Sequence, residues 1–79
     1  MQDVASDTIK RALVSSGVSV STGSRQLGIS RQQLYNLLHG RARLTVRLAV
    51  RLESLLGVDA GELLRAQLQD DLMRERAEA

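Results

Sequence analysis

The 79-residue chain is 43% apolar and 25% charged, with one aromatic residue and neither cysteine nor proline. A chain of this length buries only about 60% of the surface that its unfolded form exposes, so its core is small. Without cysteine, disulfides and thiolate metal sites are excluded, and a second subunit is the expected source of further stability. No apolar run approaches the ~18 residues of a membrane span. No signal peptide is visible after Met1, so we expect a cytoplasmic protein.

Charge is distributed unevenly along the chain. Residues 25–51 contain six arginines and no acidic residue, whereas residues 52–79 contain seven acidic residues against three arginines. An acid-free run of arginines is typical of a surface that contacts phosphate, which points to nucleic acid as a partner. The alternative is a solvated face of arginines that keeps the protein soluble.

Start and stop signals predict five helices in a single all-α domain that spans residues 1–79. Apolar residues recur at helical spacing, and glycines supply left-handed stops between the segments. The first expected helix begins near Val4 or Ser6 and runs to Ser16. The other four cover residues 20–27, 31 to about 39, 46–56 and about 60–74, and the chain is expected to fray after residue 74.

Small polar residues precede the later helices, where they are expected to cap the free backbone donors. Ser19 precedes the second helix, Thr45 the fourth, and Asp59 with Glu62 the fifth. Ser30 and Gln33 have the spacing of a capping box at the start of the third helix.

Residues 19–39 have the pattern of a helix-turn-helix. Only residues 28–30 separate the second helix from the third, and a turn this short forces the two helices to cross steeply. Gly28 supplies the glycine that such a turn needs. The apolar residues expected to hold the pair together are Leu27, Ile29, Leu34 and Leu37.

The polar face of the third helix is predicted to read DNA bases. At 100° per residue, Gln32 and Asn36 point away from the leucines of that helix. Arginine pairs with guanine, and glutamine or asparagine with adenine, in the major groove, which the N-terminal half of the helix enters. The candidate base-reading residues are Ser30, Arg31, Gln32, Gln33, Tyr35 and Asn36. The alternative is an amphipathic helix with an ordinary polar face.

Candidate phosphate contacts lie on both sides of this helix. Two are arginines of the loop that follows it, and the others are backbone donors, hydroxyls and an arginine of the second helix. The predicted set is Val20, Ser21, Thr22, Arg25, Arg41 and Arg43. Arg47 and Arg51 share one face of the fourth helix, and the sequence leaves open whether they contact phosphate or form a solvated stripe.

Several short segments together resemble the Xre/Cro-type (lambda-repressor-like) DNA-binding domain. They are residues 17–19, 26–31, 37–40, 44–45, 51–52 and 55–58. Residues 63–72 are similar to the segment that follows this motif in HigA-type antitoxins of type II toxin–antitoxin systems. Gly23 and Ser24 stand where the family usually has an apolar residue and alanine, which predicts an intrinsically weak second helix. The aromatic residues usual early in the family's fifth helix are replaced by Leu63 and Leu64.

The resemblance implies a five-helix fold and a sequence-specific transcriptional repressor of the bacterial cytoplasm, located on nucleoid DNA when bound. HigA-type antitoxins bind palindromic operators as homodimers, repress their own operon and neutralise a small basic RelE-like ribonuclease toxin. The first alternative is a stand-alone phage- or plasmid-type Cro-like regulator without a toxin. The second is a helical protein-interaction module that has lost DNA binding.

The last helix is the expected dimerisation element. Leu64, Leu68 and Leu72 fall on one stripe of it, and a chain this small has little room to bury every leucine within one subunit. Dimerisation also serves DNA recognition, because two reading helices set the half-site spacing. The acidic residues at its end are expected to keep this side off DNA, or to dock a basic toxin, and they are Asp70, Asp71, Glu75 and Glu78.

No enzymatic site is expected. His39 is the only histidine, so a zinc site has almost no ligands and no serine has an activating triad. Asp70 and Asp71 diverge by about 100° on a helix and do not form an acid/base pair. We therefore predict no catalytic residue, no metal and no cofactor.

Overall fold

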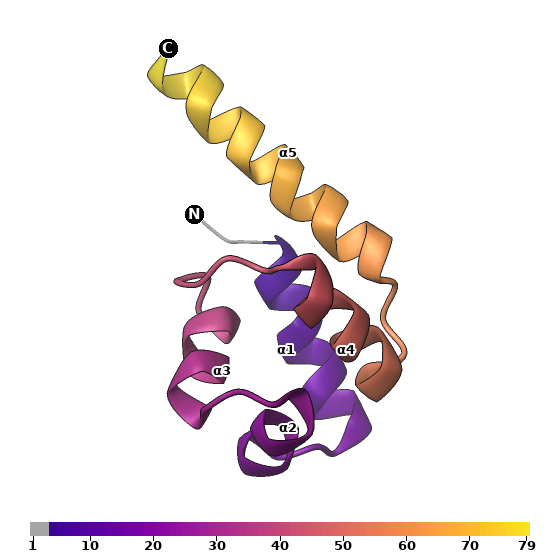
Figure 1. The fold of residues 1–79 in the computed structure, drawn as a ribbon. Helices are drawn as coiled ribbons and strands as arrows, with labels where there is room; N and C mark the ends of the chain where they lie inside the picture. The colour runs from indigo at the N-terminus through magenta and orange to yellow at the C-terminus, as the bar shows by residue number, and fades with distance from the viewer. Residues whose placement is uncertain (1–3) are drawn as a thin grey trace.

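The computed structural model describes residues 4–79 as five α-helices, with no strand in that range (Figure 1). The all-α prediction is confirmed, while the expectation about the segment at Met1 lies outside the described residues. The helices are α1 (Val4–Ser16), α2 (Val20–Leu27), α3 (Arg31–Leu38), α4 (Val46–Leu56) and α5 (Ala60–Glu78).

The predicted helix boundaries agree with the structure except at the end of α5. The residue after α3, His39, is its C-cap, and Ser19, Ser30, Thr45 and Asp59 each cap the following helix as predicted. The fifth helix does not end near residue 74 but continues to Glu78. The last turns contain mostly good helix formers, and Arg74 lies 3.5 Å from Asp71 one turn earlier, which favours the longer helix.

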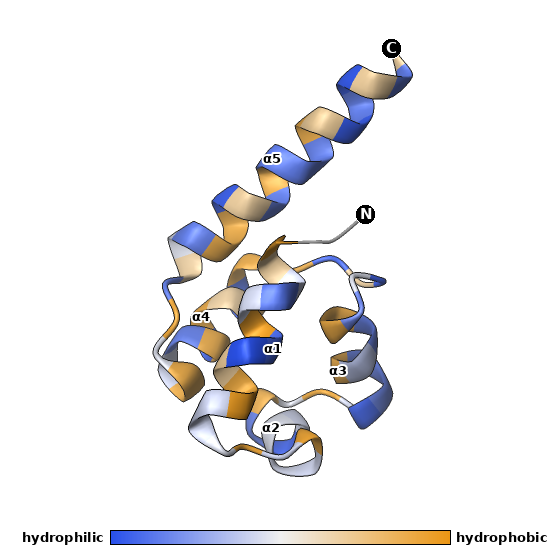
Figure 2. Cartoon of the chain, turned by 180° about the vertical axis from the view of Figure 1, so that it is seen from behind, coloured by the Kyte–Doolittle hydropathy of each residue, from blue (hydrophilic) through white to orange (hydrophobic). Residues whose placement is uncertain are grey.

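The core lies between α1, α2, α3 and α4. Its largest fully buried side chains are Ile9, Leu27, Leu34 and Leu52, one from each helix. In Figure 2 the hydrophobic sides of these helices turn toward one another, and α3 is hydrophilic on its outer side. One polar bond crosses this core, because the buried Ser6 hydroxyl donates to the carbonyl of Leu37 at 2.8 Å. These contacts fix α3 on the bundle with its polar side outward.

α5 packs on α1 and α4 along its first half, and its C-terminal half extends beyond the bundle (Figure 1). The molecule is elongated for this reason, with extents of 41 × 22 × 21 Å. Ala60 and Leu63 are buried against the core. Glu53 of α4 helps to start α5, because its carboxylate accepts the N–H of Ala60 at 2.9 Å.

α2 forms over its full predicted length despite Gly23 and Ser24. Both residues are buried, and the Ser24 hydroxyl bonds back to the carbonyl of Ser21 at 3.0 Å. A Cβ at position 23 would lie 3.5 Å from Leu13, Leu34 and Val18, which is ordinary van der Waals contact. Tertiary packing therefore compensates for the low helix propensity of this segment.

Candidate nucleic-acid interface

The turn between α2 and α3 is held by backbone bonds and by a side chain of α4. Gly28 has a φ of +73°, which a glycine adopts without strain. Its N–H donates to the carbonyl of Arg25 at 3.2 Å, and the N–H of Ile29 donates to that of Ser24 at 3.0 Å. Arg51 reaches over the turn and donates to the carbonyl of Leu27 at 2.9 Å. The angle between α2 and α3 is thus fixed both by the backbone bonds of the turn and by Arg51 of α4.

The start of α3 carries the complete capping box that the sequence predicted. The Ser30 hydroxyl accepts the N–H of Gln33 at 3.0 Å, and the Gln33 side-chain oxygen accepts the N–H of Ser30 at 2.7 Å. Both side chains were also predicted to read bases. The box uses their acceptor atoms and leaves the Ser30 hydroxyl hydrogen and the Gln33 amide N–H groups as donors.

The other predicted base-reading residues lie on the outer face of α3. Arg31 and Gln32 are exposed, Asn36 is half-buried, and Tyr35 is 47% exposed. The Gln32 amide nitrogen donates to the Asn36 side-chain oxygen at 3.1 Å. This bond leaves the Gln32 oxygen and the Asn36 amide nitrogen free, which is the acceptor and donor pair that adenine requires in the major groove.

The predicted phosphate contacts of α2 are accessible. Ser21 and Thr22 are exposed, and the N–H groups of Val20 and Ser21 have no partner among residues 4–79, whereas that of Thr22 is capped by Ser19 at 3.1 Å. Arg25 is exposed and pairs with no acidic residue of the described range. Free N–H groups at a helix start, with a cation nearby, are suited to an anionic oxygen.

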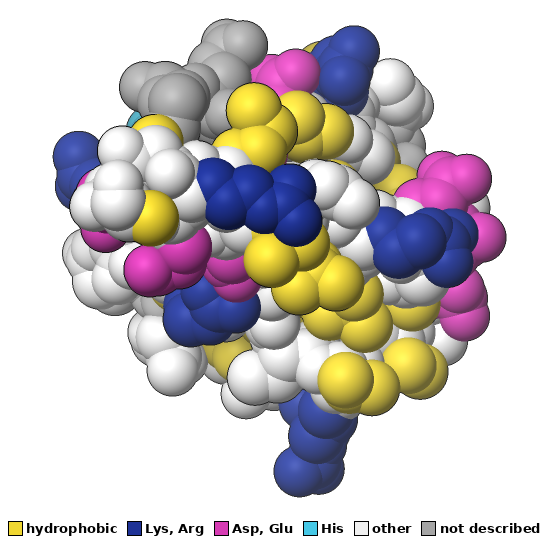
Figure 3. Space-filling model, turned by 90° about the horizontal axis from the view of Figure 1, so that it is seen from above, with side chains coloured by type: hydrophobic (Ala, Val, Ile, Leu, Met, Phe, Trp, Pro, Cys, Tyr) yellow, Lys and Arg dark blue, Asp and Glu magenta, His cyan; other side chains and the backbone are white. Residues whose placement is uncertain are grey.

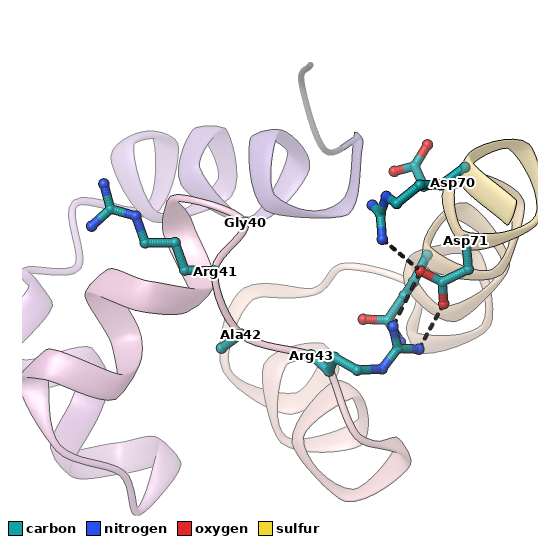
Figure 4. Close-up of a pocket in the computed structure, with 8 residues that line it drawn as sticks. Gly40, Arg41, Ala42, Arg43, Asp70 and Asp71 are labelled. Atoms are coloured by element: carbon teal, nitrogen blue, oxygen red, sulfur yellow. Dashed lines mark hydrogen bonds and ion pairs between the residues drawn. The ribbon is translucent and has the colours of Figure 1, made fainter. Parts of the chain in front are cut away.

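Arg41 and Arg43 differ, although the sequence treats them alike. The Arg41 side chain is exposed and pairs with no acidic residue of the part of the chain that the structure describes, but both terminal nitrogens of Arg43 bond the Asp71 carboxylate of α5, at 3.1 and 2.7 Å. Figure 4 shows the two arginines leaving the loop in opposite directions. The phosphate contact at position 43 stays a prediction, and in the structure an acidic residue 28 positions later in sequence bonds this guanidinium.

A groove between α3 and α4 brings the undecided arginines beside the predicted base-reading face. Gln33, Asn36, Arg47 and Arg51 line it. One terminal nitrogen of Arg51 bonds the turn between α2 and α3. Arg51 therefore has a structural partner and is not simply part of a solvated stripe. Arg47 is exposed and has no acidic partner among residues 4–79. It is therefore the one of the two that remains a candidate phosphate contact.

Two side chains of α5 hold the loop after α3, and neither is among the residues predicted from the sequence. Gln67 bonds the backbone of Leu44, and Asp71 bonds Arg43. Their position could have been predicted from the sequence, because residues 60, 63, 67, 71 and 74 recur at helical spacing on the side of α5 that faces the bundle. Of these, the polar residues at positions 67 and 71 indicate polar partners inside the fold.

Residues 4–79 hold neither a candidate metal-ligand group nor a candidate membrane-spanning helix. This range contains no group of three or more His, Cys, Asp or Glu residues that could hold a metal ion. None of its helices is both long enough and apolar enough to cross a membrane.

Two helices joined by a short glycine turn, the second with a polar outer face and beside arginines that pair with no acidic residue of the described range, define a DNA-binding helix-turn-helix domain. Comparison with models of known families matches residues 9–63 to the family described as helix-turn-helix. The match covers more than half of the chain, which therefore belongs to the Xre-type helix-turn-helix family of DNA-binding regulators. No curated protein sequence matches the chain.

Proposed function

We propose that this protein is a sequence-specific transcriptional repressor that inserts the N-terminal half of α3 into the major groove. The outer face of that helix carries the proposal, because Arg31 and Gln32 are exposed there, and Gln32 bonds the half-buried Asn36, on a helix fixed by its cap and by the core. Arg25 and Arg41 flank the face and would contact phosphate on either side.

We further propose that the chain binds an inverted-repeat operator as a homodimer through α5. Of the predicted leucine stripe, Leu64 is half-buried and packs against the core, Leu72 is half-buried, and Leu68 is 55% exposed. Val46 and Val50 of α4 are 67% and 48% exposed. Figure 3 shows hydrophobic side chains gathered in a band across the face seen from above. Exposed aliphatic side chains of this number favour a subunit contact.

The experiment that tests both proposals is selection of binding sites from a pool of random 40-bp duplexes. A homodimeric repressor enriches an inverted repeat whose half-sites lie about one helical turn apart. A monomeric reader enriches a single short site. Enrichment of no sequence, together with binding that is insensitive to salt, would favour a protein-interaction module, since a phosphate interface loses affinity steeply as salt rises.

A finer proposal is that the repressor is a HigA-like antitoxin that regulates its own operon and neutralises a basic ribonuclease toxin. The extended half of α5 supports it, because this half projects from the bundle and exposes Met73 by 63% beside Asp70, Glu75 and Glu78. Co-expression with the neighbouring reading frames tests this. A tight complex with a small basic protein that is toxic alone supports an antitoxin, whereas a clean homodimer supports a Cro-like regulator without a toxin.

A further inference from the structure

The loop between α3 and α4, residues 39–45, lies next to the predicted DNA-reading helix and is held from the opposite side by α5. Its two arginines, Arg41 and Arg43, are predicted phosphate contacts. Within the described range, the side chains of other elements that bond this loop all come from α5, and they are Gln67 and Asp71. The position of the loop therefore depends in part on a helix that packs mainly on α1 and α4.

Gln67 pairs with both backbone polar groups of one loop residue. Its side-chain oxygen accepts the N–H of Leu44 at 2.7 Å, and its amide nitrogen donates to the carbonyl of Leu44 at 2.9 Å. Leu44 is only 5% exposed, so water cannot easily replace these bonds. A buried backbone group without a partner is costly, and no other side chain of the described residues satisfies these two. The pairing fixes the loop at the residue that precedes Thr45, the N-cap of α4.

The Arg43–Asp71 pair fixes the same loop one residue earlier. The contact is bidentate, at 3.1 and 2.7 Å, and the Asp71 side chain is only 25% exposed. Two parallel bonds set the orientation of the guanidinium as well as its position. As Figure 4 shows, that orientation turns Arg43 toward α5, while Arg41 points the opposite way. We call Arg43, Leu44, Gln67 and Asp71 the α5 clamp.

We propose that Gln67 and Asp71 are positioning residues for DNA binding, and that Arg43 acts in the α5 clamp rather than as a phosphate contact. This inference rests on the proposed DNA-binding function. The N–H of Arg41 donates to the carbonyl of Asn36 in α3 at 2.8 Å, and the clamp holds the same loop at residues 43 and 44. The segment that carries Arg41 is therefore fixed at one end by α3 and at the other by α5.

Replacement of Gln67 by Met tests the first part, because it keeps the length of the side chain and removes both bonds. The probe is a fluorescein-labelled 30-bp duplex of random sequence, titrated at several salt concentrations well below the melting temperature of each variant. We expect Gln67→Met to bind about tenfold more weakly, and the Leu44 amide to exchange with solvent faster. Gln69→Met, on the exposed side of the same helix, is the matched control and should bind like the wild type.

A charge swap tests the role of Arg43. The double variant Arg43→Asp/Asp71→Arg rebuilds the clamp with the same net charge but without a cation at position 43. The variant Arg43→Asp/Glu75→Arg has that net charge too, but its new arginine lies one turn beyond the clamp. We expect the first to bind the duplex within about threefold of the wild type with an unchanged salt slope, and the second to bind about tenfold more weakly.

The outcomes separate this role from the function on which it rests. A wild type that fails to bind the duplex at low salt overturns both. If the wild type binds but Gln67→Met does so equally well while its Leu44 amide exchanges faster, the positioning role is wrong. If both double variants bind weakly, with a salt slope reduced by about 0.9, Arg43 is a phosphate contact and the clamp assignment is wrong.

Discussion

Arg51 of α4 donates a hydrogen bond from Nη1 to the carbonyl oxygen of Leu27, the last residue of α2, at 2.9 Å. The cation satisfies a carbonyl at the negative end of that helix, where positive charge is favourable. A Cβ built on Gly28 would lie 3.0 Å from the same Nη1 atom. Glycine at position 28 therefore serves both the left-handed turn and the approach of Arg51.

Replacing this glycine should cost more than replacing one with the same backbone angle elsewhere. Gly57 has a φ of +74° and no neighbour within 4 Å of its Cβ direction, so Gly57→Ala should cost only the backbone strain, about 1–2 kcal/mol. Gly28→Ala should cost about 1 kcal/mol more, because Arg51 must move and release Leu27. Urea unfolding of both variants measures the difference. Equal losses would mean that the Arg51 bond contributes nothing to stability.

Gly23→Ala should stabilise the protein. Gly23 is buried inside α2, and an added methyl group would make ordinary contacts, at 3.5 Å, with Leu13, Leu34 and Val18. Alanine in a helix interior is favoured over glycine by about 0.5–1 kcal/mol. Thermal unfolding should show a higher midpoint for this variant and a lower one for Gly17→Ala, where φ is +67°. A lower midpoint for Gly23→Ala would show that the packing at this site is tighter than the contacts imply.

Substitutions on the outer face of α3 should change sequence preference. Arg31→Ala or Gln32→Ala should each relax the preference at one operator position, with a loss of about 1–3 kcal/mol for the preferred base. Because Gln32 donates to Asn36 at 3.1 Å, the losses of binding free energy caused by Gln32→Ala and Asn36→Ala should not add in the double variant. Binding assays on single-base variants of the selected operator measure this. Arg25→Ala is the control, and it should weaken all sequences alike.

The α5 clamp should loosen in acid. The Arg43 hydrogen bond holds the pKa of Asp71 below its usual range. Because its pKa is lower in the folded state, Asp71 contributes stability to the fold. This contribution is complete above the pKa of the unfolded state, about 3.9, and is lost as pH falls through the pKa of the folded state. A pH titration followed by carbon-13 NMR of the Asp71 carboxyl should show a higher pKa for Asp71 in the Arg43→Gln variant than in the wild type. Arg74→Gln, which removes a contact at 3.5 Å, should raise it less.

Leu68→Glu should separate the subunits without unfolding them. Leu68 is 55% exposed within one chain, so a carboxylate there remains solvated in the monomer but would be buried in a dimer through α5. Analytical ultracentrifugation should show dimers for the wild type and monomers for this variant. Val14→Glu, at a position 78% exposed on α1, is the control and should remain dimeric. A dimeric Leu68→Glu would place the subunit contact elsewhere.

The sequence by itself determined the order and nearly all the boundaries of the helices. Ser19, Ser30 and Thr45 each place a side-chain oxygen within reach of a donor three residues later, and glycines take positive φ after the helices that they end. These are local interactions between residues a few positions apart, so they can be read from the chain directly. The outer face of α3 follows in the same way, because helical periodicity alone separates Asn36 from Leu34 and Leu37.

Only the tertiary structure decided which arginines are free. Arg43 and Arg41 are alike in sequence, but Arg43 meets Asp71, 28 residues away, and Arg51 meets Leu27, 24 residues away. The packing of α4 and α5 on the bundle brings these partners together. Because a guanidinium bonds whichever acceptor the fold places beside it, local sequence determined where the cations are, and long-range packing determined which of them remain available to a ligand.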